Sequence, residues 1–282
     1  MRIQLPDSLV QAARAFSAGD STPAEPRNAA TVVLTRPGAA GPEVYLLRRQ
    51  ASMAFAAGMC VFPGGGVDAR DFEAHIAWAG PSVEQWAAQL DTDAATARAL
   101  VCAAVRETFE ESGVLLAGPS ADEVVSDTTA ADWEADRVAL EGRELSFSEF
   151  LQRRGLVLRS DLLVPWSAWL TPIFEPRRYR TWFFAAALPE GQRTRDVSSE
   201  SSSVVWMAAE AAAAQVEARE LMMLPPTYLT CLQVAAFDSP SGLVAGARDR
   251  SVQMFMPEVV SDGDDFILSR PEWATELLES RE

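Results

Sequence analysis

Residues 106–113 read Arg-Glu-Thr-Phe-Glu-Glu-Ser-Gly, and this short stretch decides which fold and which chemistry we expect. An α-helix has about 3.6 residues per turn, so side chains three and four positions apart share one face. The opposite face, around Phe109, is apolar, and Gly113 stands where a helix commonly ends. The pattern predicts a helix that packs on a sheet and presents three acids on its other face: Glu107, Glu110 and Glu111.

Carboxylates this close together repel one another. A pair of like charges roughly 4 Å apart costs on the order of 1 kcal/mol in water and ~4 kcal/mol at an effective dielectric of about 20. A hard divalent cation removes this cost, because such ions prefer oxygen ligands. Arg106 lies four residues before Glu110, so it can pair with that residue and fix its orientation. We therefore expect a cation site beside the acidic face.

The chain as a whole is acidic. Its 282 residues carry a formal net charge of −16, and 48% of them are hydrophobic, which is the composition of an ordinary globular protein. An acidic surface does not attract duplex nucleic acid or an anionic membrane, so we exclude both as partners. It also repels a phosphate-rich ligand unless a cation or a cluster of basic side chains offsets the charge.

Histidine and cysteine are scarce in this chain. His75 is the single histidine, and no two of the three cysteines have the spacing of a CxxC motif. A zinc site and a Ser-His or Cys-His hydrolase are therefore not expected. The thiols are interpreted as buried and reduced. Because neither a signal peptide nor an apolar run of membrane-spanning length is found, we expect a cytoplasmic protein.

The hydrophobic pattern mixes strands and helices without a regular βαβ rhythm. This order predicts an α/β sandwich in which helices pack on a mixed sheet. Strands are expected at 29–35, 43–49, 114–116, 181–188 and 203–207. Helices are expected at 8–16, from Asp91 or Asp93 to Ser112, and at 208–221, 225–234 and 271–278, with capping boxes at Ser82–Gln85 and Ser146–Glu149.

A glycine-rich segment precedes the acidic helix. Residues 62–66 read Phe-Pro-Gly-Gly-Gly, and backbone without a Cβ can approach a ligand closely. Together with residues 106–113, this segment resembles the Nudix box, G-x5-E-x7-R-E-U-x-E-E-x-G-U, where U is apolar. The box separates its glycine and arginine by fourteen positions, whereas Gly65 and Arg106 are 106 − 65 = 41 apart, so 27 residues interrupt it. Arg98 stands eight before Arg106, where the box has glutamate.

An interrupted box is typical of the Nudix branch that resembles the peroxisomal coenzyme A diphosphatases. The segments Trp-Leu-Thr-Pro at 169–172, Arg-Arg-Tyr-Arg-Thr-Trp-Phe-Phe at 177–184 and Leu-Pro-Pro at 224–226 are similar to motifs of that branch. The coenzyme A signature of related enzymes fits at Arg49 and Gly58 but not at Ala54. The resemblance implies a Nudix-type α/β/α sandwich. We expect a lead-in over 1–27, a Nudix domain over 28–260 with helical insertions at about 69–97 and 119–165, and a tail or helix over 261–282.

The resemblance also implies roles for single residues. Glu107, Glu110 and Glu111 are expected to bind Mg²⁺ or Mn²⁺, and Arg106 belongs to the same catalytic set. Glu200 resembles the acid that other Nudix enzymes place opposite the helix, as a further metal ligand or general base, and Asp196 is its rival. Candidate substrate-binding groups are the backbone of Gly64, Gly65 and Gly66 and the guanidinium forks of Arg49, Arg177, Arg178 and Arg180.

Three functions are consistent with these features. The first is metal-dependent hydrolysis of coenzyme A or acyl-CoA to phosphopantetheine and 3′,5′-ADP. The second is hydrolysis of ADP-ribose, dinucleotides or modified nucleotides. The third is a Nudix-fold binding or regulatory protein without catalysis, a hypothesis motivated by Arg98 and the insertion. The intact glutamates favour an enzyme acting on a small-molecule nucleotide. The insertions border the box, so we interpret them as a lid or as the contact of a homodimer.

Overall fold

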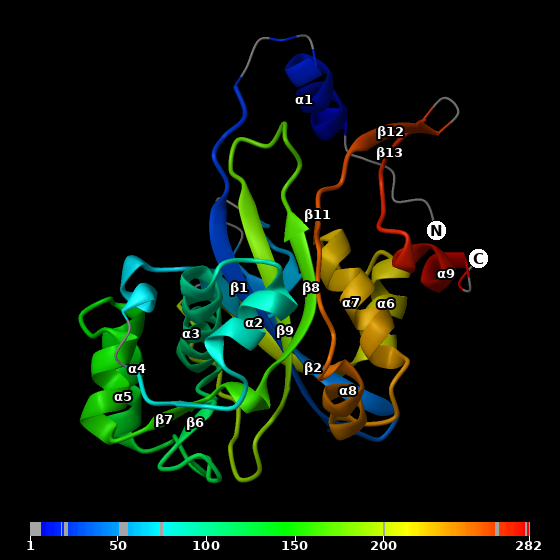
Figure 1. Ribbon diagram of the computed structural model, residues 1–282. Helices are drawn as coiled ribbons and strands as arrows, with labels where there is room; N and C mark the ends of the chain where they lie inside the picture. Colours follow the sequence, from blue (N-terminus) through cyan, green and yellow to red (C-terminus); the bar gives the residue numbers. More distant parts are fainter. Residues whose placement is uncertain are drawn as a thin grey trace.

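The computed structural model describes residues 7–17, 19, 22–50, 56–73, 76–199, 201–262, 265–279 and 281. A mixed sheet runs through the middle of the molecule with helices on both faces (Figure 1). The predicted α/β/α sandwich is therefore confirmed.

The central sheet has the strand order β10-β2-β1-β9-β8-β11. β1 and β9 run parallel, whereas β1–β2, β2–β10 and β8–β9 pair antiparallel. Two short strands extend it, because β3 pairs with β2 and β4 pairs with β1. The bounds are β1 (Arg27–Gly38), β2 (Gly41–Arg49), β3 (Cys60–Val61), β4 (Gly64–Gly66), β8 (Val164–Leu170), β9 (Tyr179–Ala187), β10 (Ser201–Ala208) and β11 (Met254–Phe255).

The side chains of β1 explain why both faces of the sheet are covered. Val32 and Leu34 pack in the hydrophobic core on one face, and Val33 packs in a second core on the other. All three are fully buried. A continuous apolar run of this kind suits a strand that is buried on both faces, since alternate side chains point in opposite directions.

One helix layer contains α2 (Val83–Leu90) and α3 (Ala94–Ser112), with α4 (Ala131–Glu141) and α5 (Phe147–Arg154) outside α3 (Figure 1). Trp86 of α2 meets Phe184 of β9 edge-on, with ring centroids 5.7 Å apart. Phe109 of α3 stacks on Phe150 of α5 at 5.3 Å. A small sheet, β5 (Trp78–Ala79), β7 (Val157–Arg159) and β6 (Ala117–Gly118), and the 3₁₀ turns η1 (Ala69–Phe72) and η2 (Ser160–Leu162) complete this side.

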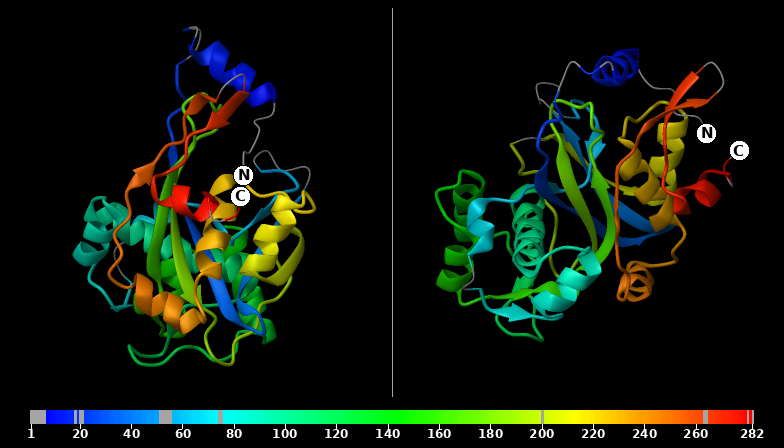
Figure 2. Two further views of the ribbon diagram at one scale, coloured as in Figure 1. Left: turned by 90° about the vertical axis from the view of Figure 1, so that its right-hand side faces the viewer. Right: turned by 45° about the horizontal axis from the view of Figure 1, so that its top comes forward.

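The other layer contains α6 (Ala209–Glu217), α7 (Pro225–Ala235) and α8 (Pro240–Ala247), with α9 (Trp273–Glu279) beside α7 (Figure 2). The hairpin of β12 (Val259–Asp262) and β13 (Asp265–Leu268) leads into α9. α1 (Asp7–Ser17) lies beyond the end of the sheet, away from both layers (Figures 1 and 2). Within the described residues, none of the helices has the length and apolar character needed to cross a membrane.

Local sequence signals predicted several helix ends, although the helix expected at 208–221 already ends at Glu217. Ser82 and Ser146 form the expected capping boxes at the starts of α2 and α5. Asp93 caps α3 by accepting a hydrogen bond from the Thr96 amide, while Asp91 instead ends α2 in a left-handed conformation with φ 51°. Gly113 ends α3 with φ 74°, a conformation that glycine adopts without steric cost.

The strand expected to begin at Val114 starts only at Ala117, where β6 pairs with β7, and residues 114–116 form a buried connecting segment. The Gln192 side chain accepts from the Leu115 amide and donates to the Leu115 carbonyl, both at 2.8 Å. One side chain thus takes the place of a partner strand.

The segment 69–97 also differs from the expected helical stretch. It contains η1, β5, α2 and the start of α3 in place of continuous helix. β8, α8 and the β12–β13 hairpin had no predicted counterparts. A short apolar run has no periodicity by which a strand can be told from a buried helix, so these elements depend on the tertiary fold.

Candidate active site

The three predicted glutamates lie together on one face of α3. It runs from its cap at Asp93 to Gly113 and packs against β1 and β4. Its apolar face is fully buried, with Val105 and Phe109 at 0% exposure. Glu110 and Glu111 are also largely buried, at 7% and 8% exposure. Carboxylates this poorly hydrated need hydrogen-bond donors or cations around them.

The glycine strand β4 lies directly against these carboxylates. Glu111 Oε2 accepts a hydrogen bond of 2.7 Å from the Gly64 amide. A Cβ placed on Gly65 would come within 2.6 Å of the carboxylate carbon and both oxygens of Glu107. Glycine at position 65 is therefore required by the close approach of backbone and carboxylate, and a larger residue would displace the Glu107 side chain.

Arg106 connects the parts of the site. Its Nε and Nη2 donate to the two oxygens of Asp71 at 3.0 and 2.9 Å, a bidentate pair. Its Nη1 donates to Glu107 at 2.7 Å and to Glu110 at 3.3 Å, and Nη2 also donates to the Gly66 carbonyl. Asp71 is 2% exposed, so this ion pair is buried. The arginine thus holds two of the glutamates and the glycine strand in one arrangement.

Asp71 fits the acidic position of the box when the pattern is counted forward from Gly65 and not back from Arg106. Counting back from Arg106 leads to Arg98, whose guanidinium instead lies over the Trp78 ring at 5.9 Å from its centroid. Counting six residues forward from Gly65, as G-x5-E prescribes, leads to Asp71. All 27 inserted residues therefore fall between Asp71 and Arg106. Since an acid does pair with Arg106, Arg98 no longer supports the hypothesis of an inactive protein.

We predict that alanine substitutions of Asp71 and Arg98 differ in their effects on stability and turnover. Asp71→Ala leaves the partly buried Arg106 without its bidentate partner, so we expect a loss of about 3 kcal/mol in stability and roughly 10- to 100-fold in turnover. Arg98→Ala should change stability by about 0.5–1 kcal/mol and turnover by less than about twofold. Denaturant unfolding and steady-state kinetics on both variants check this. Equal effects of the two substitutions would contradict the assignment of Asp71.

The electrostatics of the glutamates favour a bound cation. Burial and the neighbouring carboxylate of Glu107 raise the pKa of Glu110 to about 7, although Arg106 acts in the opposite direction. The positive charge of Arg106 does not compensate the cluster fully. A divalent cation would add the charge that keeps these carboxylates ionised.

The residues present fit such a cation by their chemistry. They offer carboxylate oxygens and glycine backbone, which are the donors that Mg²⁺ and Mn²⁺ prefer. In the described parts of the chain, no three acidic, histidine or cysteine side chains already surround one point as metal ligands do. Arg106 Nη1 lies between Glu107 and Glu110 and bonds to both. Binding of a cation would therefore require at least one of these bonds to lengthen.

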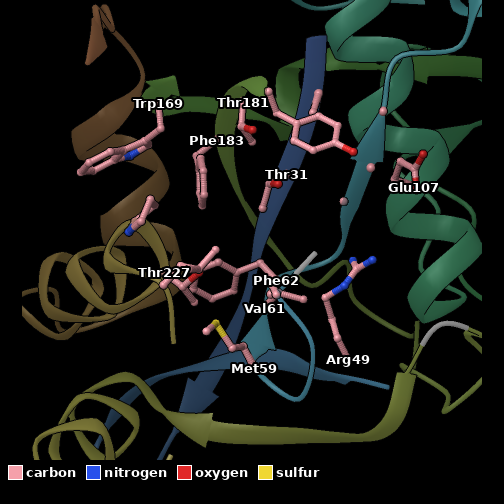
Figure 3. A pocket seen from close by; sticks show the side chains of 18 of the residues that line it. Thr31, Arg49, Met59, Val61, Phe62, Glu107, Trp169, Thr181, Phe183 and Thr227 are labelled. Carbon is pink, nitrogen blue, oxygen red and sulfur yellow. The ribbon is translucent and has the colours of Figure 1, made fainter. Parts of the chain in front are cut away.

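A large cavity opens beside the acidic face. It has a volume of about 1510 Å³ and is lined by the three glutamates, β4, and residues from β8, β9 and the α6–α7 loop. Figure 3 shows Glu107 on one side of the cavity, Trp169 and Phe183 on the opposite side, and Thr31 and Thr181 from neighbouring strands between them. Its volume exceeds the roughly 300–1,000 Å³ of a typical small-molecule site, which suits a long ligand.

The structure separates the predicted arginines into two groups. Arg49 and Arg177 line the cavity. Arg178 and Arg180 do not, because their guanidinium groups donate to the carbonyls of Ala24 and Pro26 and hold the segment before β1. Arg178 and Arg180 therefore do not belong to the candidate site. Three further cavity-lining arginines gave no signal in the sequence: Arg70, Arg143 and Arg219.

Of the two acidic residues predicted to lie opposite the helix, the structure describes only Asp196. Glu200 lies outside the described residues, as do His75 and Ala54, so the proposed role of Glu200 stays a prediction. Its rival Asp196 is exposed and does not line the cavity. The three cysteines are buried and free, as expected.

Comparisons with known proteins agree with this geometry. The family model described as the NUDT19 Nudix domain matches residues 81–233, more than half of the chain. The acyl-coenzyme A diphosphatase NUDT19 of Gallus gallus is 25% identical over 87% of this chain and 78% of its own length. The protein of that name from Xenopus laevis is 25% identical over 81% and 70%. A crystal structure of a Nudix hydrolase from Alicyclobacillus acidocaldarius superimposes with a TM-score of 0.67 at 27% identity, covering 78% of this chain and 96% of that one.

Proposed function

The chain belongs to the Nudix hydrolase family, in the group described by the NUDT19 Nudix domain, and we propose that it is a metal-dependent diphosphatase of coenzyme A and its thioesters. The reaction would cleave the diphosphate and release 3′,5′-ADP together with phosphopantetheine or its acylated form. One observation carries the proposal: the carboxylates of α3 and the glycines of β4 meet at one end of a cavity large enough for an extended nucleotide. The names of the relatives supply the substrate class.

The acidic end of the cavity would hold the metal. Glu107, Glu110 and Glu111 would bind Mg²⁺ or Mn²⁺, which when present neutralises the diphosphate oxygens and activates water for attack on phosphorus. The side chain of Arg106 orients Glu107 and Glu110 through its hydrogen bonds. The absence of a side chain at Gly65 lets the Glu107 carboxylate lie directly against the backbone of β4.

The arginines of the cavity would bind the substrate phosphates. Arg49 and Arg177 line it, and their forked guanidinium groups suit phosphate oxygens. In a chain of net charge −16, these side chains provide the local positive charge that a phosphate-rich substrate needs.

Substrate turnover tests the proposal directly. The purified chain is incubated with CoA, acyl-CoA, NADH, ADP-ribose and diadenosine polyphosphates, each with Mg²⁺ or Mn²⁺, and the products are separated by chromatography. We expect 3′,5′-ADP and phosphopantetheine from CoA. Hydrolysis of ADP-ribose or a dinucleotide with CoA untouched would favour the alternative of another nucleotide hydrolase. No turnover of any nucleotide with either metal would mean that the chain is not a diphosphatase.

The separation of the arginines predicts a second difference. Arg49→Ala should raise the KM for CoA by roughly 10- to 100-fold, because one charge-assisted hydrogen bond to phosphate contributes about 1.5–3 kcal/mol. Arg180→Ala should leave the KM within about twofold, because Arg180 binds Pro26 and Glu25 away from the cavity. Steady-state kinetics with CoA measure both. A larger rise for Arg180→Ala than for Arg49→Ala would overturn this assignment of the phosphate-binding arginine.

A further inference from the structure

The last turn of α3 carries Glu110 and Glu111, and its carbonyl groups are held from outside the helix. The last four carbonyls of an α-helix have no partner within the helix itself. In this helix the Ser112 carbonyl accepts a hydrogen bond of 2.9 Å from the Arg195 amide. The Glu110 carbonyl accepts one of 2.7 Å from Nη1 of Arg137. Two distant segments of the chain therefore fix the turn that presents two of the candidate metal ligands.

Arg137 belongs to α4, within the insertion at about 119–165, and its side chain is 3% exposed. Its guanidinium group also binds one acid on each side along α4. Glu134 accepts from Nη2 at 2.7 Å, and Glu141 accepts from Nη1 at 3.0 Å. A buried guanidinium group needs acceptors for its N–H donors, and the two carboxylates and the helix carbonyl supply them. Arg137 thus fixes both acids of α4 relative to the end of α3.

Both acids also bind the segment 195–199, which precedes β10 in the chain. Oε2 of Glu134 accepts a hydrogen bond of 2.6 Å from Nη1 of Arg195. Oε1 of Glu141 accepts two hydrogen bonds from Ser199, one of 3.0 Å from the amide and one of 2.6 Å from the hydroxyl group. α4 therefore holds this segment at its first and last residues, while Arg137 holds the same helix to α3.

The segment 195–199 reaches the cavity of the candidate active site. Ser198 lines this cavity and is 8% exposed, and Glu141 lines it as well. In the sequence, the candidate base Glu200 follows Ser199 directly. α4 consequently links two parts of the proposed catalytic machinery: the last turn of α3 and the chain that leads into residue 200.

We propose that α4 is a positioning element of the active site, in which Glu141, itself held by Arg137, keeps the segment 195–199 fixed relative to the carboxylates of α3. This inference rests on the proposed function and gives the insertion at about 119–165 a role in catalysis. Glu141 is a positioning residue in this arrangement, because it acts through Ser199. Residues that orient catalytic groups typically contribute about 10- to 100-fold to activity, and a displacement of such a group by about 1 Å can cost roughly a hundredfold.

Two alanine substitutions and their combination test the proposal in the full chain with CoA and Mg²⁺. Glu141→Ala removes the acceptor of both Ser199 bonds, whereas Ser199→Ala removes only the hydroxyl bond. We expect kcat to fall roughly tenfold in the first variant and about threefold in the second. The KM for CoA should stay within about twofold, because the cavity arginines that would bind phosphate are unchanged. The double variant should be no slower than Glu141→Ala, since both substitutions break the same contact.

Hydrogen exchange of the protein without metal gives a readout that does not depend on turnover. Amide exchange measured by mass spectrometry should be faster over 195–199 in Glu141→Ala, because the Ser199 amide loses its acceptor. The fold should survive, because the Tyr45 hydroxyl and the Gln50 side chain still donate to backbone carbonyls of this segment.

Glu144→Ala is the matched control for Glu141→Ala. Glu144 lies three residues further along the chain, is exposed and does not line the cavity. This control should keep the kcat and the amide exchange of the wild type. Thermal unfolding of every variant shows whether the fold is retained.

Several results would overturn the inference while the diphosphatase function stands. If kcat of Glu141→Ala stays within about twofold of wild type, α4 has a structural role only, even where the melting temperature falls. A raised KM with unchanged kcat would mean that Glu141 contacts the substrate. Independent, multiplicative losses from the two substitutions, or unchanged exchange over 195–199, would show that Glu141 does not act through Ser199. A wild-type protein that hydrolyses no nucleotide refutes the proposed function and this inference together, so the wild-type rate distinguishes the two failures.

Discussion

Glu110→Gln is expected to reduce metal-dependent turnover by more than about a hundredfold. Residues that only support metal ligands typically contribute about 10- to 100-fold, so a direct ligand should contribute more. Glutamine keeps the shape of the side chain but removes the negative charge that the cation needs. The fold should survive, because the substitution also removes the repulsion by Glu107 that raises the pKa of Glu110. Initial rates with CoA at saturating Mg²⁺ measure the effect.

Thermal unfolding gives an independent readout of the same substitution. Addition of Mg²⁺ should raise the melting temperature of the wild type, because a ligand that binds only the folded state stabilises it. The Glu110→Gln protein should lose most of this rise. Glu144→Gln is the matched control, since Glu144 is exposed and lies outside the cavity. If Glu110→Gln keeps a rate within a few-fold of wild type, Glu110 is not a metal ligand.

The three consecutive glycines of β4 should respond differently to alanine. The three atoms nearest to a Cβ on Gly65 belong to the Glu107 carboxylate, so Gly65→Ala should displace that carboxylate and reduce turnover by at least about tenfold. A Cβ on Gly64 would come within 2.5 Å of the Ala30 carbonyl and 2.7 Å of the Thr31 Cα. Backbone atoms cannot move aside as easily as the end of a side chain, so Gly64→Ala should lower the free energy of unfolding by about 1–3 kcal/mol.

Gly66→Ala is the internal control of this series, because a Cβ added there would have open space within 4 Å. We expect near wild-type rate and stability for this variant. Denaturant unfolding and initial rates, measured for each of the three alanine variants, distinguish their effects. A pattern in which Gly65→Ala is as active as Gly66→Ala would show that Glu107 does not need its observed position.

The acidic helix could be predicted because the residues that define it are close together in the sequence. The carboxylate spacing, the Asp93 cap and the terminal Gly113 all lie within α3, and the structure places each where the helical period puts it. The strands β1, β2, β9 and β10 were also predicted, since their apolar and β-branched runs are long enough to be distinctive. The α/β/α sandwich follows from these long elements together.

The missed features depend on contacts between distant parts of the chain. Counting forward from Gly65 leads to Asp71, but only the structure shows that Asp71 meets Arg106 across 35 positions. Arg178 and Arg180 look like phosphate-binding arginines by type, but the parallel pairing of β9 with β1 places them beside the segment before β1. The Leu115 segment is held by Gln192, 77 positions away. Such partners follow only from the assembled fold.

The interruption between Asp71 and Arg106 has a consequence for folding. In an uninterrupted box the two residues are eight positions apart, whereas here the loop to be closed is 35 positions long. Loop-closure entropy grows with the logarithm of length, so the added cost is only about 1.3 kcal/mol. Burial of Trp86 and Leu90 from the inserted segment in the main core offsets this cost. The Asp71–Arg106 ion pair therefore closes a non-local loop, and the two halves of the box come together only when the intervening chain has folded.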